Sequence, residues 1–205
     1  MAVSSEKEET ILWMSYLIKS CPRQMKWLYE KIEKVVEVGQ FDSTEHKKNQ
    51  EILKKNFEKN GYRVELEKLL IADYKNYKLG HYYDLVATIE NEEKEKIVIE
   101  VKPEDMDYYI PQYLTAQAIL RLNRIRYKYY VYEYNTQKMI NKNNFDNRMI
   151  VEFLNSKIKI LHYDAPALKM GNDCYYCQFA QCINHPRHEQ NQKENKNREN
   201  EVKSC

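Results

Sequence analysis

The sequence of 205 residues contains only four glycines and five prolines. It therefore lacks the glycine-rich loops with which many nucleotide-binding proteins enclose a phosphate chain. It has no run of about 20 apolar residues, so a membrane-spanning helix is not expected. Its formal net charge is only +2. Binding to nucleic acid would need a local patch of basic residues, because the chain as a whole is not basic.

Cysteine is scarce too, and the five that are present are unevenly placed. Cys174, Cys177 and Cys182 form a C-x2-C-x4-C cluster, whereas Cys21 stands far upstream before a proline. No signal peptide is recognised, so we expect a cytoplasmic protein with reduced thiols. Four thiolates could hold an iron–sulfur cluster or a structural zinc. The alternative is a local zinc site in which His185 takes the place of Cys21.

The most informative pattern is a pair of alternating segments, Leu85–Ile89 and Ile97–Val101, which follow the run from Gly80 to Asp84. The polar residues 90–96 between them suit a turn, so the two segments predict a β-hairpin. Odd positions of both segments are apolar, so the even positions should share the other face if no bulge intervenes. The charged side chains expected together on that second face are Asp84, Glu100 and Lys102.

Two carboxylates on one face of a sheet suit a hard divalent cation such as Mg²⁺ or Mn²⁺. Such a cation lowers the pKa of bound water and stabilises charge on a phosphoryl oxygen. Lys102 lies two residues beyond Glu100 and could position the water or neutralise developing charge. Charged residues at the end of a strand are also common on ordinary solvated surfaces, so the pattern needs support from the rest of the chain.

That support comes from a resemblance. The glycine-x-x-x-aspartate run that ends at Asp84, followed by Glu100-x-Lys102, resembles the RecB branch of the PD-(D/E)xK nuclease superfamily. His81 departs from the branch, which has a hydrophobic residue there. The resemblance implies an α/β, restriction-endonuclease-like core with a mixed central sheet flanked by helices. It also implies a metal-binding histidine on an earlier helix, for which His46 is the candidate.

In this family the metal site is made by a histidine, two carboxylates and one backbone carbonyl. Carried over to this sequence, the implied ligands of Mg²⁺ or Mn²⁺ are His46, Asp84, Glu100 and the backbone carbonyl of Val101. A Gln-x-x-x-Tyr motif on the next helix contacts the substrate or the site. Gln112 matches that motif, but Ala116 stands where the tyrosine is expected. Tyr108 and Tyr109 flank the same helix and are further candidates for substrate binding.

The cysteines narrow the resemblance further. Their order, with Cys21 before the nuclease motif and three cysteines after it, resembles the CRISPR-associated, RecB-like iron–sulfur exonucleases, the fourth family in the Cas naming scheme. Related forms occur in archaeal viruses. The resemblance covers about residues 10–186. It implies that a 4Fe–4S cluster joins the N- and C-terminal parts of the chain, and the implied cluster ligands are Cys21, Cys174, Cys177 and Cys182.

The resemblance implies a Mg²⁺- or Mn²⁺-dependent deoxyribonuclease that acts on single-stranded DNA as a 5′-to-3′ exonuclease. A CRISPR integrase is the candidate protein partner, and a homo-oligomer is compatible with the sequence. One alternative is a non-catalytic DNA-binding or scaffold protein that serves a CRISPR integrase or a viral recombination machinery. Another is a small zinc-binding adaptor built around the late cysteines.

The expected organisation is a single nuclease domain from residue 9 to 186. Residues 1–8 should be frayed, and the polar residues 187–205 should form a disordered tail. The hairpin core is expected over about residues 62–134, and the cluster region comprises Cys21 and residues 166–186. The expected helices cover residues 11–19, 22–39, 45–60, 110–121 and 149–157. The remaining strands are expected over residues 62–71 and 127–134, with a polar connection over residues 136–144.

Overall fold

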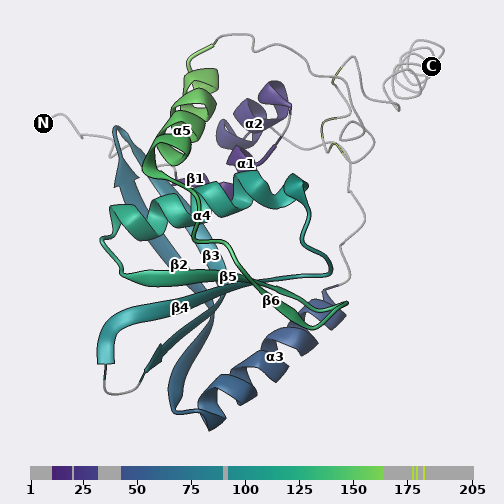
Figure 1. The fold of residues 1–205 in the computed structure, drawn as a ribbon. Coiled ribbons are helices and arrows are strands. Elements are labelled where there is room, and N and C mark those ends of the chain that lie inside the picture. The colour runs from purple at the N-terminus through teal and green to yellow at the C-terminus, as the bar shows by residue number, and fades with distance from the viewer. Residues whose placement is uncertain are drawn as a thin grey trace, which may run out of the picture. The chain divides into compact units, whose positions relative to one another are not determined.

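The computed structural model describes residues 11–19, 21–31, 43–89 and 92–163, together with Cys177, Phe179 and Cys182. These residues form an α/β fold in which helices flank a mixed sheet of six strands (Figure 1). No helix in these ranges is both long enough and apolar enough to cross a membrane. The elements in chain order are β1 (Ile11–Trp13), α1 (Met14–Leu17), α2 (Pro22–Tyr29), α3 (Thr44–Lys59), β2 (Tyr62–Tyr74), β3 (Tyr77–Ile89), β4 (Glu92–Lys102), the 3-10 helix η1 (Asp107–Tyr109), α4 (Ile110–Leu122), β5 (Tyr127–Glu133), β6 (Lys138–Asn141) and α5 (Asn147–Leu161).

The chain divides into two compact units. The first unit comprises residues 1–18 and 42–158, and the second comprises residues 19–41 and 159–205. The whole sheet, and with it the expected hairpin core, belongs to the first unit. The expected cluster region, Cys21 with residues 166–186, falls in the second. The expected frayed residues 1–8 and the expected disordered tail over residues 187–205 lie outside the described residues.

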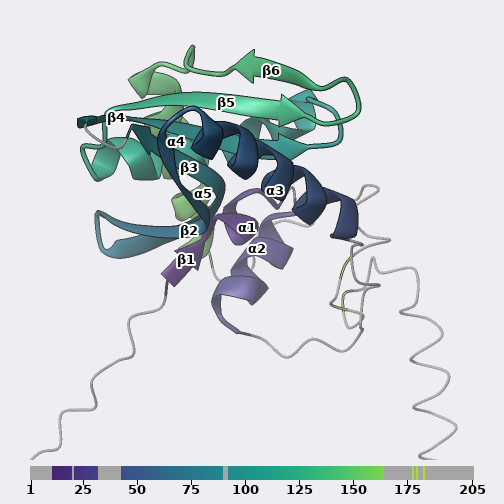
Figure 2. The same ribbon diagram turned by 90° about the horizontal axis from the view of Figure 1, so that it is seen from below.

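Strand β3 is the centre of the sheet because three other strands pair with it. Strand β2 runs antiparallel along its full length, from the pair Tyr62–Ile89 to the pair Tyr74–Tyr77. On the opposite edge, β1 pairs in parallel with residues 78–80, and β4 pairs antiparallel with residues 85–89. Among the described strands, residues 81–83 of β3 are therefore paired with β2 alone. This leaves an opening in the sheet between β1 and β4 (Figure 2 shows the sheet from below).

In the hairpin of β3 and β4, odd-numbered residues of one strand pair with odd-numbered residues of the other, as expected. Leu85 pairs with Ile99 and Ala87 with Ile97, and the one register shift lies beside the turn, between Thr88 and Ile89. Strand β4 already begins at Glu92, so the connecting turn is shorter than expected.

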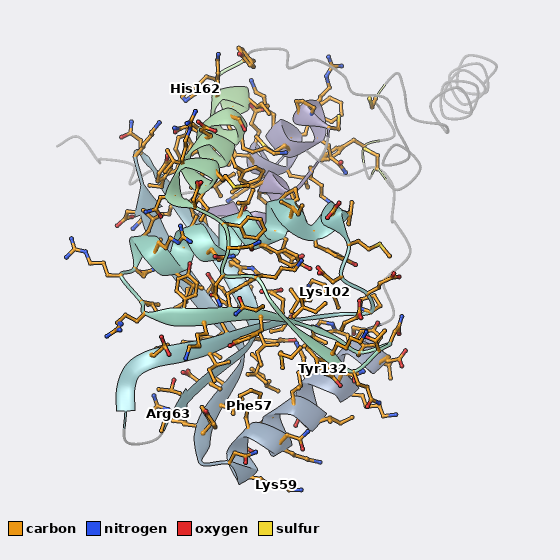
Figure 3. The ribbon with its side chains drawn as sticks, viewed as in Figure 1. Phe57, Lys59, Arg63, Lys102, Tyr132 and His162 are labelled. Carbon is orange, nitrogen blue, oxygen red and sulfur yellow. The ribbon has the colours of Figure 1, made fainter. Side chains whose placement is uncertain are left out.

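The odd-numbered face of this hairpin packs on α3 in the first unit. Leu53 of α3 contacts a buried cluster, and Phe57 and Tyr132 pack against that cluster between helix and sheet (Figure 3). The other buried members of the cluster are Leu85, Ala87, Ile99 and Val101. Helix α3 was expected over residues 45–60, which is confirmed within one residue at each end. Ile52 of the same helix is 42% exposed.

Helix α4 covers the even-numbered face, on the side of the sheet opposite α3 (Figure 1). It connects β4 to β5, which are parallel, and parallel neighbours need a crossover of this kind. Strand β4 stops at Lys102 because Pro103 cannot donate to a ladder. Residues 113–120 of α4 are all buried. The even face of the hairpin is therefore an interior, whereas the sequence alone predicted only that it differs from the apolar face.

Three expected elements were wrong. Residues 11–19 were expected to be one helix, but 11–13 form β1 and only 14–17 are helical. The helix expected over 22–39 ends at Tyr29, ten residues early. The polar connection over 136–144 contains β6, which pairs with β5. For β1 and β6, pairing with a distant strand outweighed the local pattern.

Two buried tyrosines offer a matched test of the packing beneath α4. Tyr83 donates its hydroxyl hydrogen to the carbonyl oxygen of Ala116 at 2.6 Å. The hydroxyl of Tyr129 is equally buried and has no hydrogen-bond partner among the described residues. Burial raises the pKa of both phenols well above the usual value, so both stay neutral donors.

We expect Tyr129→Phe to stabilise the protein by about 1 kcal/mol, because it removes an unsatisfied buried hydroxyl. Tyr83→Phe should instead destabilise it by about 1 kcal/mol, since a made hydrogen bond is lost. Urea unfolding of both variants beside the wild type measures the difference. Equal losses of stability in the two variants would contradict the assignment of Tyr129 as unsatisfied.

Candidate active site

Asp84 stands at the point where β3 and β4 separate. Their ladder ends at the pair Leu85–Ile99, and the Asp84 side chain then continues the contact, because its Oδ2 accepts the backbone N–H of Val101 at 2.7 Å. The N–H and C=O of one strand residue point to the same edge, so the Val101 carbonyl also faces the β3 side. The carbonyl of Lys102, the next residue, bonds to Tyr134 of the segment after β5 and so faces the other edge. The Val101 carbonyl thus faces the same edge as the Asp84 side chain.

His46 and Gln50 reach Asp84 from one face of α3. Nε2 of His46 lies 3.2 Å from Asp84 Oδ1, and the Gln50 amide nitrogen lies 3.2 Å from the same oxygen. The two nitrogens are 3.0 Å apart. If His46 Nε2 carries its hydrogen, it donates a hydrogen bond to Asp84. If it does not, it accepts a hydrogen bond from the Gln50 amide, which also donates to the Asp84 carboxylate. In the second arrangement the Nε2 lone pair, which a metal ligand would need, is directed at the Gln50 amide.

Glu100 is almost completely buried, with 1% of its surface exposed, and three side chains contact its carboxylate. Nε2 of His81 lies 2.8 Å from Oε1, and the Gln112 amide donates to Oε2 at 2.7 Å. Nζ of Lys102 donates to the same Oε2 at 3.2 Å. A buried carboxylate is costly unless such donors surround it. Donors from β3, β4 and α4 together meet that requirement.

Lys102 is shared by the two carboxylates, because its Nζ also lies 3.7 Å from Asp84 Oδ2. Burial lowers the pKa of Lys102, but the charges of Glu100 and Asp84 outweigh it and hold that pKa above its usual value. Burial likewise raises the pKa of Asp84, but the hydrogen bond with His46 and the charge of Lys102 outweigh it and hold that pKa below the usual value. Lys102 and Asp84 are therefore both held in their charged forms. The ring of Tyr109 lies 5.5 Å from Nζ of Lys102.

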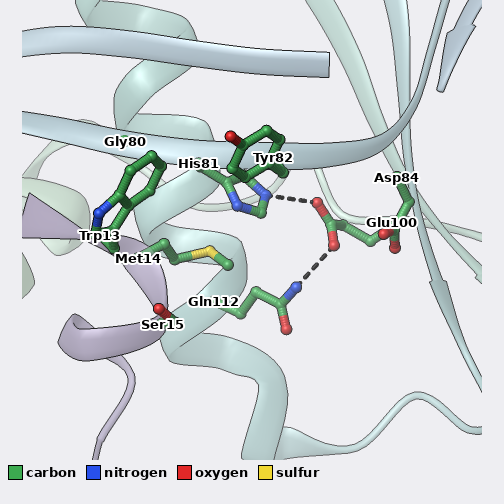
Figure 4. Close-up of a pocket in the computed structure, with 9 residues that line it drawn as sticks. All are labelled: Trp13, Met14, Ser15, Gly80, His81, Tyr82, Asp84, Glu100 and Gln112. Atoms are coloured by element: carbon green, nitrogen blue, oxygen red, sulfur yellow. Dashed lines mark hydrogen bonds and ion pairs between the residues drawn. The ribbon is translucent and has the colours of Figure 1, made fainter. Parts of the chain in front are cut away.

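A cavity of about 230 Å³ opens at this cluster, in the gap of the sheet. Trp13, Met14 and Ser15 lie on one side of it, and Asp84, Glu100 and Gln112 lie on the other, with residues 80–82 of β3 between them (Figure 4). The arrangement follows from the fold: β1 ends at Trp13 beside Gly80, and β4 joins β3 only at Leu85. The carboxylates are thus reached from a hollow rather than lying on a flat surface.

The donor types at the cluster fit a hard divalent cation. Two carboxylates face one ammonium, so one negative charge remains when the imidazoles are neutral, and a cation would be attracted to it. Carboxylate, imidazole and carbonyl groups are the ligands that Mg²⁺ and Mn²⁺ accept. Within the described ranges, no three His, Cys, Asp or Glu side chains are already grouped around one metal position. In this structure Lys102 is the cation that the two carboxylates share.

The expected substrate-binding residues lie in different surroundings. Gln112 is bonded to Glu100, so in this structure it supports the carboxylate. Tyr109 lies over Lys102, whereas Tyr108 is 71% exposed. Tyr108 packs edge-on against Tyr109, with ring centroids 5.3 Å apart. Of the two tyrosines, Tyr109 is therefore the one that touches the cluster.

The expected cluster ligands lie in the second unit, where described residues of α2 contact the C-terminal segment. The ring of Trp27 packs edge-on against Phe179, with centroids 5.1 Å apart. The Lys26 ammonium donates to the backbone carbonyl of Tyr163. Phe179 is fully buried and accepts a turn hydrogen bond from the amide of Cys182 at 3.0 Å. The described thiols of this unit, none in a disulfide, are Cys21, Cys177 and Cys182.

Cys174 and His185 lie outside the described residues. Because α2 begins directly after Cys21, the contact between Trp27 and Phe179 joins the two cysteine-bearing segments. This contact does not determine where the sulfur atoms lie. Within the described part of the chain, no three His, Cys, Asp or Glu side chains are grouped as metal ligands.

Comparisons with known proteins place the chain in no family. No family model matches it, and no curated protein is similar to it. A solved structure described as "Crystal structure of SSO0001" is similar over 89% of this chain and 90% of its own, with 21% sequence identity and a TM-score of 0.49. A likeness of this size carries no inference about activity.

Three residues of the site were not expected from the sequence. Gln50 lies one turn after His46, so it shares the helix face of that histidine, and this spacing could have indicated it. His81 was noted only as a departure from the nuclease motif, yet it is a direct partner of Glu100. Trp13 had no local signal, because the pairing of β1 with β3 brings it to the cavity.

His81 should be needed to keep Glu100 buried. We expect His81→Phe to lower the free energy of unfolding by about 1.5–3 kcal/mol, because a hydrogen bond to a buried charged group is lost while ring volume is kept. His81→Gln retains an amide donor and should recover part of the loss. Chemical denaturation of the three proteins is the measurement. A phenylalanine variant as stable as the wild type would show that Glu100 does not depend on His81.

Proposed function

We propose that the protein is a metal-dependent deoxyribonuclease that hydrolyses phosphodiester bonds, built on a PD-(D/E)xK core. The proposal rests above all on one observation: Lys102 contacts both Asp84 and Glu100, and the two carboxylates line a cavity. His46 reaches the same cluster from another element. Burying two carboxylates and a lysine together is costly for stability alone, and such costs are commonly retained at functional sites.

In this proposal His46, Asp84, Glu100 and the Val101 carbonyl hold Mg²⁺ or Mn²⁺. A cation bound there supplies an acidified water and stabilises negative charge on a phosphoryl oxygen. Lys102, held charged by its neighbours, orients the attacking water or balances the charge that develops on the phosphate. His81 and Gln112 fix the Glu100 carboxylate. The partial burial of the cluster strengthens each of these interactions.

The finer expectations from the resemblance belong to the same proposal. The substrate is single-stranded DNA, the action is exonucleolytic and the direction is 5′ to 3′. A 4Fe–4S cluster held by Cys21, Cys174, Cys177 and Cys182 is structural, because hydrolysis needs no electron transfer. The protein acts in the cytoplasm, with a CRISPR integrase as candidate partner.

The test is digestion of end-labelled single- and double-stranded DNA with Mg²⁺, with Mn²⁺ and with a chelator. We expect cleavage of the single strand that depends on the metal, and the labelled end that is released gives the direction. Folded, metal-supplied protein that binds DNA but never cleaves it would favour the scaffold alternative. Cleavage that persists in chelator would overturn the metal-dependent mechanism.

A further inference from the structure

The cavity beside the carboxylates has a second side that the hydrolytic chemistry does not use. Trp13 lies there, and Tyr82 of the neighbouring strand stacks on it with the rings nearly parallel, at an interplanar angle of 8° and a centroid separation of 5.7 Å. This is the offset stacking that aromatic pairs prefer. Tyr82 is 52% exposed although it lies in the central strand of the sheet. An exposed aromatic ring stacked on tryptophan presents a flat surface at the cavity.

The backbone holds this pair in place. Trp13 is the last residue of β1 and pairs with Gly80, two residues before Tyr82. A Cβ atom on Gly80 would lie 2.7 Å from Cγ2 of Ile11 and 3.0 Å from the Trp13 ring. Only glycine leaves room for the ring to lie against β3 in this way. The position of Trp13 is therefore built into the sheet rather than left to a free side-chain rotation.

The aromatic pair is continuous with the candidate active site. Trp13 and Tyr82 line the same cavity as Asp84 and Glu100, with Trp13 on the side away from those carboxylates and Tyr82 between (Figure 4). A nucleotide presents a charged phosphate at one end and a flat base at the other. The cavity offers the matching pair of surfaces: a site for a cation and phosphate, and an aromatic platform.

We propose that Trp13 and Tyr82 form a stacking subsite for the nucleobase adjacent to the phosphate held at Asp84 and Glu100. The inference rests on the proposed nuclease function and adds to it the residues that hold the base. Stacking tolerates every base because each has a π face, so the subsite does not read sequence. It requires an unpaired base, since a base within a duplex has both faces covered by its neighbours.

Trp13 itself reports on this subsite, because the chain has only two tryptophans, Trp13 and Trp27. Trp27→Phe leaves Trp13 as the sole indole, and Glu100→Gln in the same chain prevents cleavage. With Mg²⁺ present, we expect single-stranded oligothymidine to quench Trp13 fluorescence. An oligomer of the same length made of abasic sugar phosphates should bind without quenching. In the reciprocal chain with Trp13→Phe, the fluorescence of Trp27 should not respond.

Affinity gives a second readout. Tyr82→Ala should weaken binding of oligothymidine by about 5- to 150-fold, which corresponds to the loss of one stacked base. Binding of the abasic oligomer should change little. Gly80→Ala should have the same selective effect, because it displaces the Trp13 ring. Tyr163→Ala removes a half-exposed tyrosine that does not line the cavity, and it serves as the control.

The outcomes separate this subsite from the function on which it rests. Oligothymidine that binds without quenching Trp13, and equally well to Tyr82→Ala, would overturn the subsite and leave the nuclease proposal standing. Equal quenching by the abasic oligomer would also overturn it, because stacking would not be the cause. Failure of the protein to bind either oligomer would overturn both proposals.

Discussion

Replacing Lys102 by methionine should reduce metal-dependent cleavage of DNA by at least about 100-fold. The ammonium is the only charged donor, among the described residues, that the structure places on both Asp84 and Glu100. Loss of one preorganised electrostatic group at a reacting centre typically costs about 10²- to 10³-fold in rate. Methionine keeps the length of the side chain and removes the charge. Single-turnover digestion of end-labelled single-stranded DNA measures the effect.

The matched control is Lys128→Met on the neighbouring strand β5. Lys128 pairs with Glu95 on the surface, is 53% exposed and does not line the cavity, so its loss should leave cleavage unchanged. A surface pair of this kind contributes little to stability. Equal cleavage by the wild type and Lys102→Met would show that the hairpin is not the site. Equal losses in the two lysine variants would point to a general effect on DNA binding.

Lys102→Met should also change how the protein responds to a divalent cation. Without the lysine, Asp84 and Glu100 repel each other, so the metal-free variant should be less stable than the wild type. A bound cation would replace the missing positive charge, and ligands that bind only the folded state stabilise it. We therefore expect Mn²⁺ to raise the melting temperature of Lys102→Met by more than that of the wild type. The reverse order would contradict a cation site at these carboxylates.

Replacing Cys21 by alanine should remove the metal centre of the second unit and lower its stability. Cys21 precedes α2, and α2 is joined to the C-terminal segment through Trp27 and Phe179. A cluster with ligands from both segments would hold them together, and the free energy of metal binding would then contribute to folding. The measurements are iron, sulfide and zinc content together with thermal unfolding. We expect bound iron in the wild type and its loss in the variant.

Cys205→Ala is the control for this experiment, because Cys205 belongs to the polar stretch for which no structural role is expected. Iron retained by Cys21→Ala, with unchanged melting, would exclude the four-cysteine cluster. Zinc in place of iron, bound equally by the wild type and Cys21→Ala, would identify the local site of Cys174, Cys177, Cys182 and His185. In that case the two ends of the chain would not be joined by a metal.

Much of the candidate site followed from the alternation of residue types along two segments. Odd positions from Leu85 to Val101 are apolar, and this pattern alone predicts that the charged residues lie on the other face. Within the ladder of β3 and β4 the alternation holds, because the one register shift lies at the turn. Asp84 lies beyond that ladder, and His46 of α3 contacts it. The sequence predicted helix α3 equally well, because its apolar residues have helical spacing and Asn60-Gly61 marks its C-terminal end.

Other features depend on contacts between distant residues. Strand β1 has three residues, too few for a periodic signal, and it exists because it pairs with β3. Strand β6 is likewise defined by its pairing with β5. Alternation shows which residues share a face but not what covers that face. The burial of Glu100 under His81 and Gln112 could not be foreseen for this reason.

The sequence by itself determined the chemistry of the site: which side chains lie on one hairpin face and the order of the cysteines around it. Only the tertiary structure decided the environment. Among the described strands, residues 81–84 of β3 have no partner on one edge, because pairing with β1 stops at Gly80 and pairing with β4 starts at Leu85. That opening creates the cavity, brings Trp13 to the carboxylates and lets α4 cover Glu100. Local residue patterns determine which side chains share one face of a strand. A cavity depends on where strands that are distant in the sequence stop pairing.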